Sequence, residues 1–185
     1  YNFVKKFLDP NEKHSNCAVQ FFKILNSIIN SIDLIEIRGR DSLGLCFQFV
    51  LKLTKSNLEW YKINEVDKKH LSKIVGDKII IHATYKHFSR IGKLGENAKN
   101  ILNLFLNDKL ILDLVKSDQY DSIAIVAHTR WASVGLVNQE NVHPLINLKS
   151  PSTQIPTILS FINGDVYNYR EIYDNMSWEG GIDYN

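Results

Sequence analysis

The sequence has little of what builds disulfide-rich or metal-dependent proteins. Its 185 residues include only two cysteines, Cys17 and Cys46, which show no CxxC spacing. Two cysteines are too few for a disulfide scaffold, so we expect both thiols to be reduced. The six histidines stand in no HxH or HExxH pattern, and the glycine-containing segment IGKLGEN at 91–97 lacks the GK[ST] of a phosphate loop. We therefore expect no metal and no cofactor.

Long apolar runs and clusters of one charge are also missing. No apolar run approaches the roughly 20 residues that a membrane helix needs, and the first residues lack the apolar stretch and cleavage site of a signal peptide. The 22 basic residues nearly balance 20 acidic ones and are spread along the chain. We therefore expect no membrane and no nucleic-acid partner, and a cytoplasmic location.

The chain does have enough apolar sequence, 44% of its residues, for one sizeable core in a single domain. Apolar residues at helical spacing predict a helix that Ser15 or Asn16 caps and that buries one face. They are Ala18, Phe21, Phe22, Leu25, Ile28, Ile29, Ile32 and Ile35. From Leu43 to Leu53 apolar and other residues alternate, which predicts a strand.

Further elements follow from shorter patterns. We predict strands at 59–66 and 78–84, and one or two helices over 97–116 with a break near Asn107 and Asp108. The apolar runs at 122–127 and 157–162 predict strands in a covered sheet, and 167–174 predicts a short helix. This order is typical of an α+β fold whose sheet faces are covered by helices.

Two polar segments begin or end these elements. Residues 37–44, IRGRDSLG, join the first helix to the first strand, where Gly39 permits a tight turn and Arg38 could simply face the end of the helix. Residues 127–135, AHTRWASVG, follow a strand and contain an arginine, whose fork can bind a carboxylate at two points. The alternative for this segment is a surface loop with Trp131 tucked into the core.

Two more polar segments follow. In NVHPL, residues 141–145, His143 precedes a proline that favours extended backbone, and a lone histidine is usually structural. In FINGDVYNY, residues 161–169, Asn163 and Gly164 could form a hairpin turn, but the sequence after them reads as helix rather than as a returning strand. A side-chain amide and a backbone N–H at that point could hold a developing oxyanion.

In combination and order these segments resemble the motifs of the class II glutamine amidotransferases. Those motifs are RGYDSAG, HTRWATHG, NxHP, and HNG followed by a further Asn; this chain has RGRDSLG, HTRWASVG, NVHP and INGDVYN. The Trp of HTRW is typical of the glutamine:fructose-6-phosphate amidotransferase (glucosamine-6-phosphate synthase) type, and the resemblance spans about 18–173.

The resemblance implies an Ntn-hydrolase-like α/β/β/α sandwich of stacked, largely antiparallel sheets covered by helices, lacking its first strand in this chain. It implies one partial amidotransferase domain over 1–185, with insertions at about 54–90 and 147–156 that we place away from the site. It also implies hydrolysis of glutamine to glutamate and ammonia. The ammonia would pass to a sugar phosphate on a C-terminal isomerase domain, through which the protein could dimerise.

Roles carry over only at matching positions. Arg130 would clamp the glutamine α-carboxylate, with Thr129, Trp131 and Ser133 shaping the mobile loop that closes over the substrate. Asn163 and Gly164 would form the oxyanion hole. Supporting roles fall to a further set: Arg38 near the nucleophile, Asp41 and Ser42 bracing the turn, and His143 and Asn168 orienting loops around the pocket.

This chain also departs from the family pattern. The family nucleophile is an N-terminal Cys whose own amine is the base, but here the first residue is Tyr1 and Cys17 is internal. Either the nucleophile lies on an upstream segment, which the missing first strand favours, or the protein is a non-hydrolytic relative that binds an amino acid or a partner domain. No TDTE-like segment is present, and Asp165 and Asp183 match the family's amine-binding Asp poorly by position. Val134, Ile162 and Arg40 replace family residues.

Overall fold

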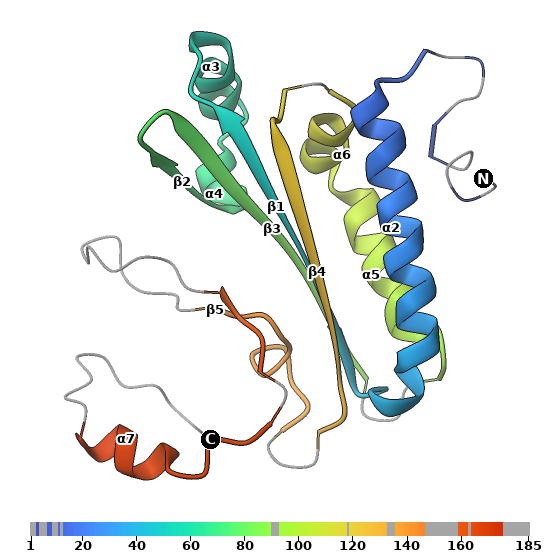
Figure 1. Ribbon diagram of the computed structural model, residues 1–185, viewed down its shortest axis with the longest axis vertical. Helices are drawn as coiled ribbons and strands as arrows, with labels where there is room; N and C mark the ends of the chain where they lie inside the picture. The colour runs from blue at the N-terminus through green and yellow to red at the C-terminus, as the bar shows by residue number, and fades with distance from the viewer. Residues whose placement is uncertain are drawn as a thin grey trace.

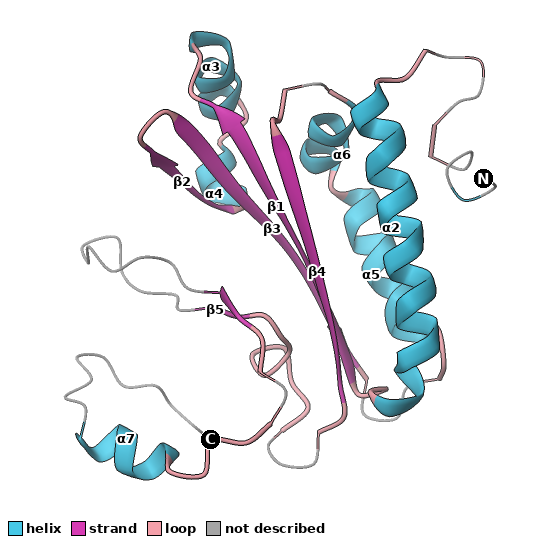
Figure 2. Cartoon of the chain, in the orientation of Figure 1, coloured by secondary structure: helices cyan, strands magenta, loops and turns pink. Residues whose placement is uncertain are grey.

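The computed structural model describes residues 3, 7–8, 11, 13–89, 93–117, 119–132, 136–146, 159–162 and 164–175. Figure 1 shows the chain from end to end, and Figure 2 shows its helices and strands. Several predictions lie outside these residues: the oxyanion residue Asn163, the loop residues Ser133 and Val134, Asp183, the insertion at 147–156, and residues 157–158 of the strand predicted at 157–162.

The fold is α+β and is built on a four-stranded antiparallel sheet in the order β2-β3-β1-β4. Its strands are β1 (Ser42–Lys52), β2 (Leu71–Val75), β3 (Lys78–Phe88) and β4 (Ser122–Arg130). β1 pairs with β3 and β4 along its length, so Gly44 lies opposite both Lys86 and His128. In the described part of the sheet, β2 and β4 are the edge strands.

Three helices cover one face of this sheet (Figure 1). They are α2 (Asn16–Ile35), α5 (Glu96–Asn107) and α6 (Lys109–Lys116). The predicted cap is confirmed, since the Ser15 side chain accepts a hydrogen bond of 3.0 Å from Ala18 N. The predicted break between two helices is also confirmed, because Asp108 ends α5 and caps α6. After α2 a short 3-10 helix, η1 (Glu36–Arg38), turns the chain into β1.

The core lies between these helices and the sheet and is rich in aromatic rings. Phe21 of α2 contacts Phe47 of β1 and Phe105 of α5, with ring centroids 5.2 and 5.7 Å apart. All three side chains are at most 1% exposed. Because the odd-numbered residues of β1 point to the helices, the even-numbered ones, including Cys46, point to the opposite face.

That opposite face is partly covered, near the end of β4, by the last part of the chain (Figure 1). This part contains the two-stranded pair β5 (Leu145–Ile146) and β6 (Leu159–Ser160), and then α7 (Tyr169–Asn175). The predicted helix after Asn-Gly is therefore confirmed. Farther along the same sheet face Val126 is 43% exposed.

One predicted strand is wrong. Residues 59–66 belong to the helices α3 (Lys55–Ile63) and α4 (Val66–Lys69), and the edge strand β2 follows them. Aromatic and β-branched residues suggested a strand, but the side chain of Thr54 accepts a hydrogen bond from Asn57 N, which starts a helix. The Asn57 side chain then donates to Lys52 O, which fixes this helix to the end of β1.

One helix bears on the expectation that the chain does not enter a membrane. The helical stretch Asn16–Arg38 is long and apolar enough to cross a membrane, with a mean hydropathy of 1.2, although polar residues interrupt it. Core helices of globular domains pass the same test, and the buried residues of α2 pack on the aromatic core described above. This helix is weak evidence for a membrane.

Candidate functional site

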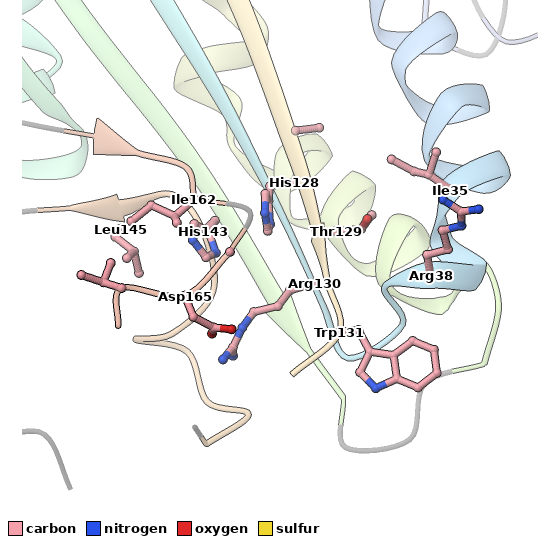
Figure 3. Close-up of a pocket in the computed structure, with 13 residues that line it drawn as sticks. Ile35, Arg38, His128, Thr129, Arg130, Trp131, His143, Leu145, Ile162 and Asp165 are labelled. Atoms are coloured by element: carbon pink, nitrogen blue, oxygen red, sulfur yellow. The ribbon is translucent and has the colours of Figure 1, made fainter. Parts of the chain in front are cut away.

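A cavity of about 720 Å³ opens at the end of β4, between the η1 turn and the chain after β6 (Figure 3). Its volume is in the range of small-molecule sites. Every predicted substrate-binding or catalytic residue in the described part of the chain lines it. These residues are Arg38, Thr129, Arg130, Trp131, His143 and Gly164. Segments far apart in the sequence therefore meet in one place.

The RGRD segment supports the end of β4 from one side. The Asp41 carboxylate accepts a 2.7 Å hydrogen bond from Ala132 N, and Asp41 N donates to Arg130 O at 3.1 Å. These hydrogen bonds are consistent with the bracing role predicted for Asp41. These two bonds hold the backbone on both sides of Trp131 and fix the direction in which Arg130 leaves the strand.

Glycine is required at position 39 for a reason other than the tight turn that was expected. Its φ of −159° is extended rather than left-handed. A Cβ at this position would lie 2.9 Å from Thr129 Oγ1 and 3.0 Å from Arg130 N. Glycine is needed here because the RGRD backbone lies directly against the strand that carries Arg130.

Arg130 extends from the end of β4 toward the segment that carries Asp165 (Figure 3). Its guanidinium donates a hydrogen bond to Leu136 O at 3.4 Å. Trp131 points the other way and is 65% exposed. The alternative that Trp131 is tucked into the core is therefore wrong, and its ring is available at the rim of the cavity.

Two histidine rings lie on the sheet face behind Arg130. The rings of His128 and His143 are 4.1 Å apart and tilted by 32°. His143 is 7% exposed, and neither of its ring nitrogens has a hydrogen-bond partner in the described structure. Its loop lies flat on β1, since a Cβ on Gly44 would come within 1.5 Å of His143 O.

Both rings are neutral at ordinary pH. Burial, together with the nearby charges of His128, Arg130 and Lys86, lowers the pKa of His143 to about 4. Burial and the charge of Arg130 also lower the pKa of His128, although a hydrogen bond with the Ile162 backbone opposes this shift. The fixed positive charges lining the cavity are therefore those of Arg38 and Arg130.

Two polar residues that line this cavity, His128 and Asp165, are not among the predicted site residues. The predicted strand ended at Ala127, which left His128 in a loop, whereas β4 continues to Arg130. Alternation along the longer strand would have placed His128 on the same face as Arg130. Asp165 was set aside by its position in the family pattern, but it lies on the cavity wall that faces the arginines.

Neither cysteine lines the cavity. Cys46 is buried on the sheet face beside Thr84, and burial raises the pKa of its thiol, which makes it a poor nucleophile. Cys17 lies in the first turn of α2. Within the part of the chain that the structure describes, no group of three or more potential metal ligands occurs.

The chain is similar to two curated enzymes. It is 26% identical over 158 residues to glutamine–fructose-6-phosphate aminotransferase (isomerizing) from Thermotoga maritima. It is 27% identical over 150 residues to the enzyme of the same name from Encephalitozoon cuniculi. These alignments cover 85% and 81% of this chain but only 18% and 16% of the relatives. The similarity supports an origin related to this enzyme.

Other comparisons add nothing to this. No family model matches the chain, and no solved structure matches it significantly. The chain spans less than a fifth of the length of each of these curated relatives.

Proposed function

We propose that the protein hydrolyses glutamine to glutamate and ammonia, and that the ammonia is passed to a sugar phosphate for amino-sugar synthesis. The observation that carries this proposal is the single cavity in which Arg130 and Gly164 line the wall, one from the end of β4 and the other from the segment after β6. The similarity to glutamine–fructose-6-phosphate aminotransferases supports the same activity. The acceptor would bind to an isomerase domain outside this chain, which could also form a homodimer.

Charge suits the cavity to an α-amino acid. The guanidinium of Arg130 can bind an α-carboxylate through two parallel hydrogen bonds. The carboxylate of Asp165 can accept hydrogen bonds from the α-ammonium group. With both groups on the α-carbon held, the side-chain amide of glutamine would be free to extend toward Gly164.

At that amide, nucleophilic attack would produce a tetrahedral intermediate with a negatively charged oxygen. The side-chain amide of Asn163 and the backbone N–H of Gly164 would stabilise this oxygen. Gly164 has a φ of +145°, a region that other residues rarely adopt. This conformation explains why glycine occupies the position.

The nucleophile would come from a further strand. In the described sheet β4 is an edge, and its residues up to Arg130 carry no charge and no proline that would protect it from pairing. An antiparallel strand added there would begin beside Thr129 and the cavity, where an N-terminal cysteine could reach the substrate amide. Such pairing would extend the sheet toward the Ntn-hydrolase sandwich that the resemblance implies.

The test is a glutaminase assay of the full-length protein with matched variants. We expect Asn163→Ala to lower kcat about 100- to 1,000-fold, because an oxyanion donor is lost. Arg130→Ala should act mainly by raising KM for glutamine, and Asp165→Asn should do so to a smaller degree. Arg170→Ala, on the exposed face of α7, should match the wild type.

Two outcomes would contradict the proposal. Equal activity of the wild type and Asn163→Ala would remove the oxyanion assignment. Glutamine binding that depends on Arg130, with no hydrolysis by the full-length protein, would instead establish the non-hydrolytic amino-acid-binding module.

A further inference from the structure

His128 lies on β4 at the place where the loop that carries His143 approaches the sheet. It lies two residues before Arg130 on the same face of the strand, and its partner across β1 is Gly44. Because Gly44 has no side chain, the loop that carries His143 can lie against the sheet beside the His128 ring. A sheet residue and a loop residue are thus brought into ring contact.

The His128 ring contacts both chain segments that cross this face of the sheet. It stacks on His143, at a centroid separation of 4.1 Å, and thereby contacts the loop at 136–146. The backbone of Ile162 lies close enough to the His128 ring to raise its pKa, and the centroid of the Phe161 ring lies 6.4 Å from that of His128. Ile162 directly precedes Asn163 and Gly164.

We propose that His128 is a positioning residue, which fixes the segment 159–166 relative to Arg130 while its ring is neutral and stacked on His143. This inference rests on the proposed function for its catalytic consequence, since that segment would carry the oxyanion hole. Arg130 and His128 are held on one strand, so a single rigid element would set the distance between the carboxylate clamp and the oxyanion donors.

The surrounding charges explain why the rings must be neutral. The charges of Arg130 on β4 and Lys86 on β3 act on the pair, and among the described residues that line the cavity the one carboxylate is that of Asp165. A proton on either ring would add a positive charge to this group and place it within 4.1 Å of the other ring. We therefore expect the contact between 159–166 and the sheet to weaken in acid.

The experiment compares His128→Ala, His128→Phe and the control His82→Phe in the full-length protein. His82 lies on the same face of the sheet, on β3, and its ring contacts Gln48 instead of the cavity. Amide hydrogen exchange is measured at 136–146 and 159–166, and kcat and KM are measured for glutamine. These two readouts are independent of each other.

For His128→Ala we expect exchange at both segments to rise about tenfold, with β1 and β3 unchanged. His128→Phe keeps an aromatic ring against His143 but loses the ring nitrogen that faces the Ile162 backbone, so exchange should rise at 159–166 alone. Misplacement of the oxyanion donors should lower kcat by up to about 100-fold, with little change in KM. The acid limb of the kcat profile should also shift in His128→Phe, which a purely structural role would not cause.

Unchanged exchange at 159–166 in His128→Ala would overturn the proposal, as would an equal rise in His82→Phe. Unchanged kcat alongside faster exchange would overturn its catalytic part. If the wild type has no glutaminase activity but exchange responds as expected, the positioning role is supported and only the proposed function fails.

Discussion

Single residues place the site through close approach of backbones as much as through charge. Gly39 and Gly44 leave room for the end of β4 and for the His143 loop, respectively. The sequence motifs predicted that Arg38, Arg130 and His143 belong to one site, since each motif brings its own polar residue. They could not predict the glycine contacts, because those depend on which strands become neighbours.

Substitution of Gly44 tests this close approach. In Gly44→Ala the new Cβ would lie 1.5 Å from His143 O, so the loop at 136–146 must move away from the sheet. We expect faster amide exchange across the loop and a higher KM for glutamine. Gly76→Ala is the control, because its Cβ meets nothing within 4 Å and only backbone strain at φ +59° results. If exchange at 136–146 in Gly44→Ala equals that of the wild type, the close approach of the loop to Gly44 is contradicted.

Acid stability tests the buried histidine. The native pKa of His143 is about 4 and its ordinary value is 6.5, so between these values the unfolded chain binds a proton that the native one excludes. The free energy of unfolding should therefore rise with pH from about 4 to 6.5. In His143→Phe, urea titrations should show a smaller rise in the free energy of unfolding between pH 4 and 6.5. An unchanged slope would mean that the ring is not buried as described.

At the scale of elements, strong periodic patterns predicted the structure well. The helix from Asn16, the strand from Leu43 and the break at Asp108 are all confirmed. The strand predicted at 59–66 failed because capping by Thr54 outweighs the preference of its aromatic residues for strands. β2 was missed because most of its residues are exposed, so the short edge strand shows no alternation of buried and exposed positions.

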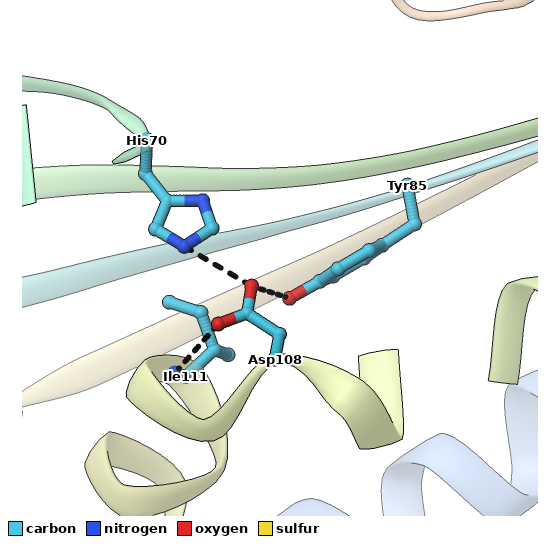
Figure 4. A network of polar contacts seen from close by, with 4 residues as sticks. All are labelled: His70, Tyr85, Asp108 and Ile111. Atoms are coloured by element: carbon cyan, nitrogen blue, oxygen red, sulfur yellow. Dashed lines mark hydrogen bonds and ion pairs between the residues drawn. The ribbon is translucent and has the colours of Figure 1, made fainter. Parts of the chain in front are cut away.

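The α5–α6 junction is held by a polar network (Figure 4). The Asp108 carboxylate accepts a hydrogen bond of 2.8 Å from Tyr85 and one of 3.2 Å from Ile111 N, and it lies 3.1 Å from His70. Burial would raise the pKa of Asp108, but the hydrogen bonds and the charge of His70 outweigh it and lower the pKa. The pKa of Tyr85 is raised, mainly by burial and further by the neighbouring Asp108 carboxylate.

Loss of this carboxylate should destabilise the fold at neutral pH. We expect Asp108→Ala to lower the free energy of unfolding by about 1–3 kcal/mol, because a helix cap and two side-chain partners are lost. Since the native pKa is below the ordinary 3.8, the difference from the wild type should shrink as the pH falls through the native value. The control is Asp113→Ala, at an exposed residue of α6. In thermal melts its free energy of unfolding should be within about 0.5 kcal/mol of that of the wild type.

At the scale of the whole molecule, one sheet face is covered by helices, and the other is partly covered, near the end of β4, by the cavity-forming end of the chain. The order of motifs predicted which segments meet, but not that β4 would be an edge strand of the described sheet. That arrangement leaves the cavity beside an open strand, with Arg130 at its end.

The most direct test of this account is to map the binding of L-glutamate, the proposed product, by amide chemical shifts in the full-length protein. We predict saturable shifts at 128–132 and 162–166, and their loss in Arg130→Ala but not in Arg170→Ala. Shifts confined to other surfaces, or shifts that persist without Arg130, would contradict a carboxylate-binding cavity at the end of β4.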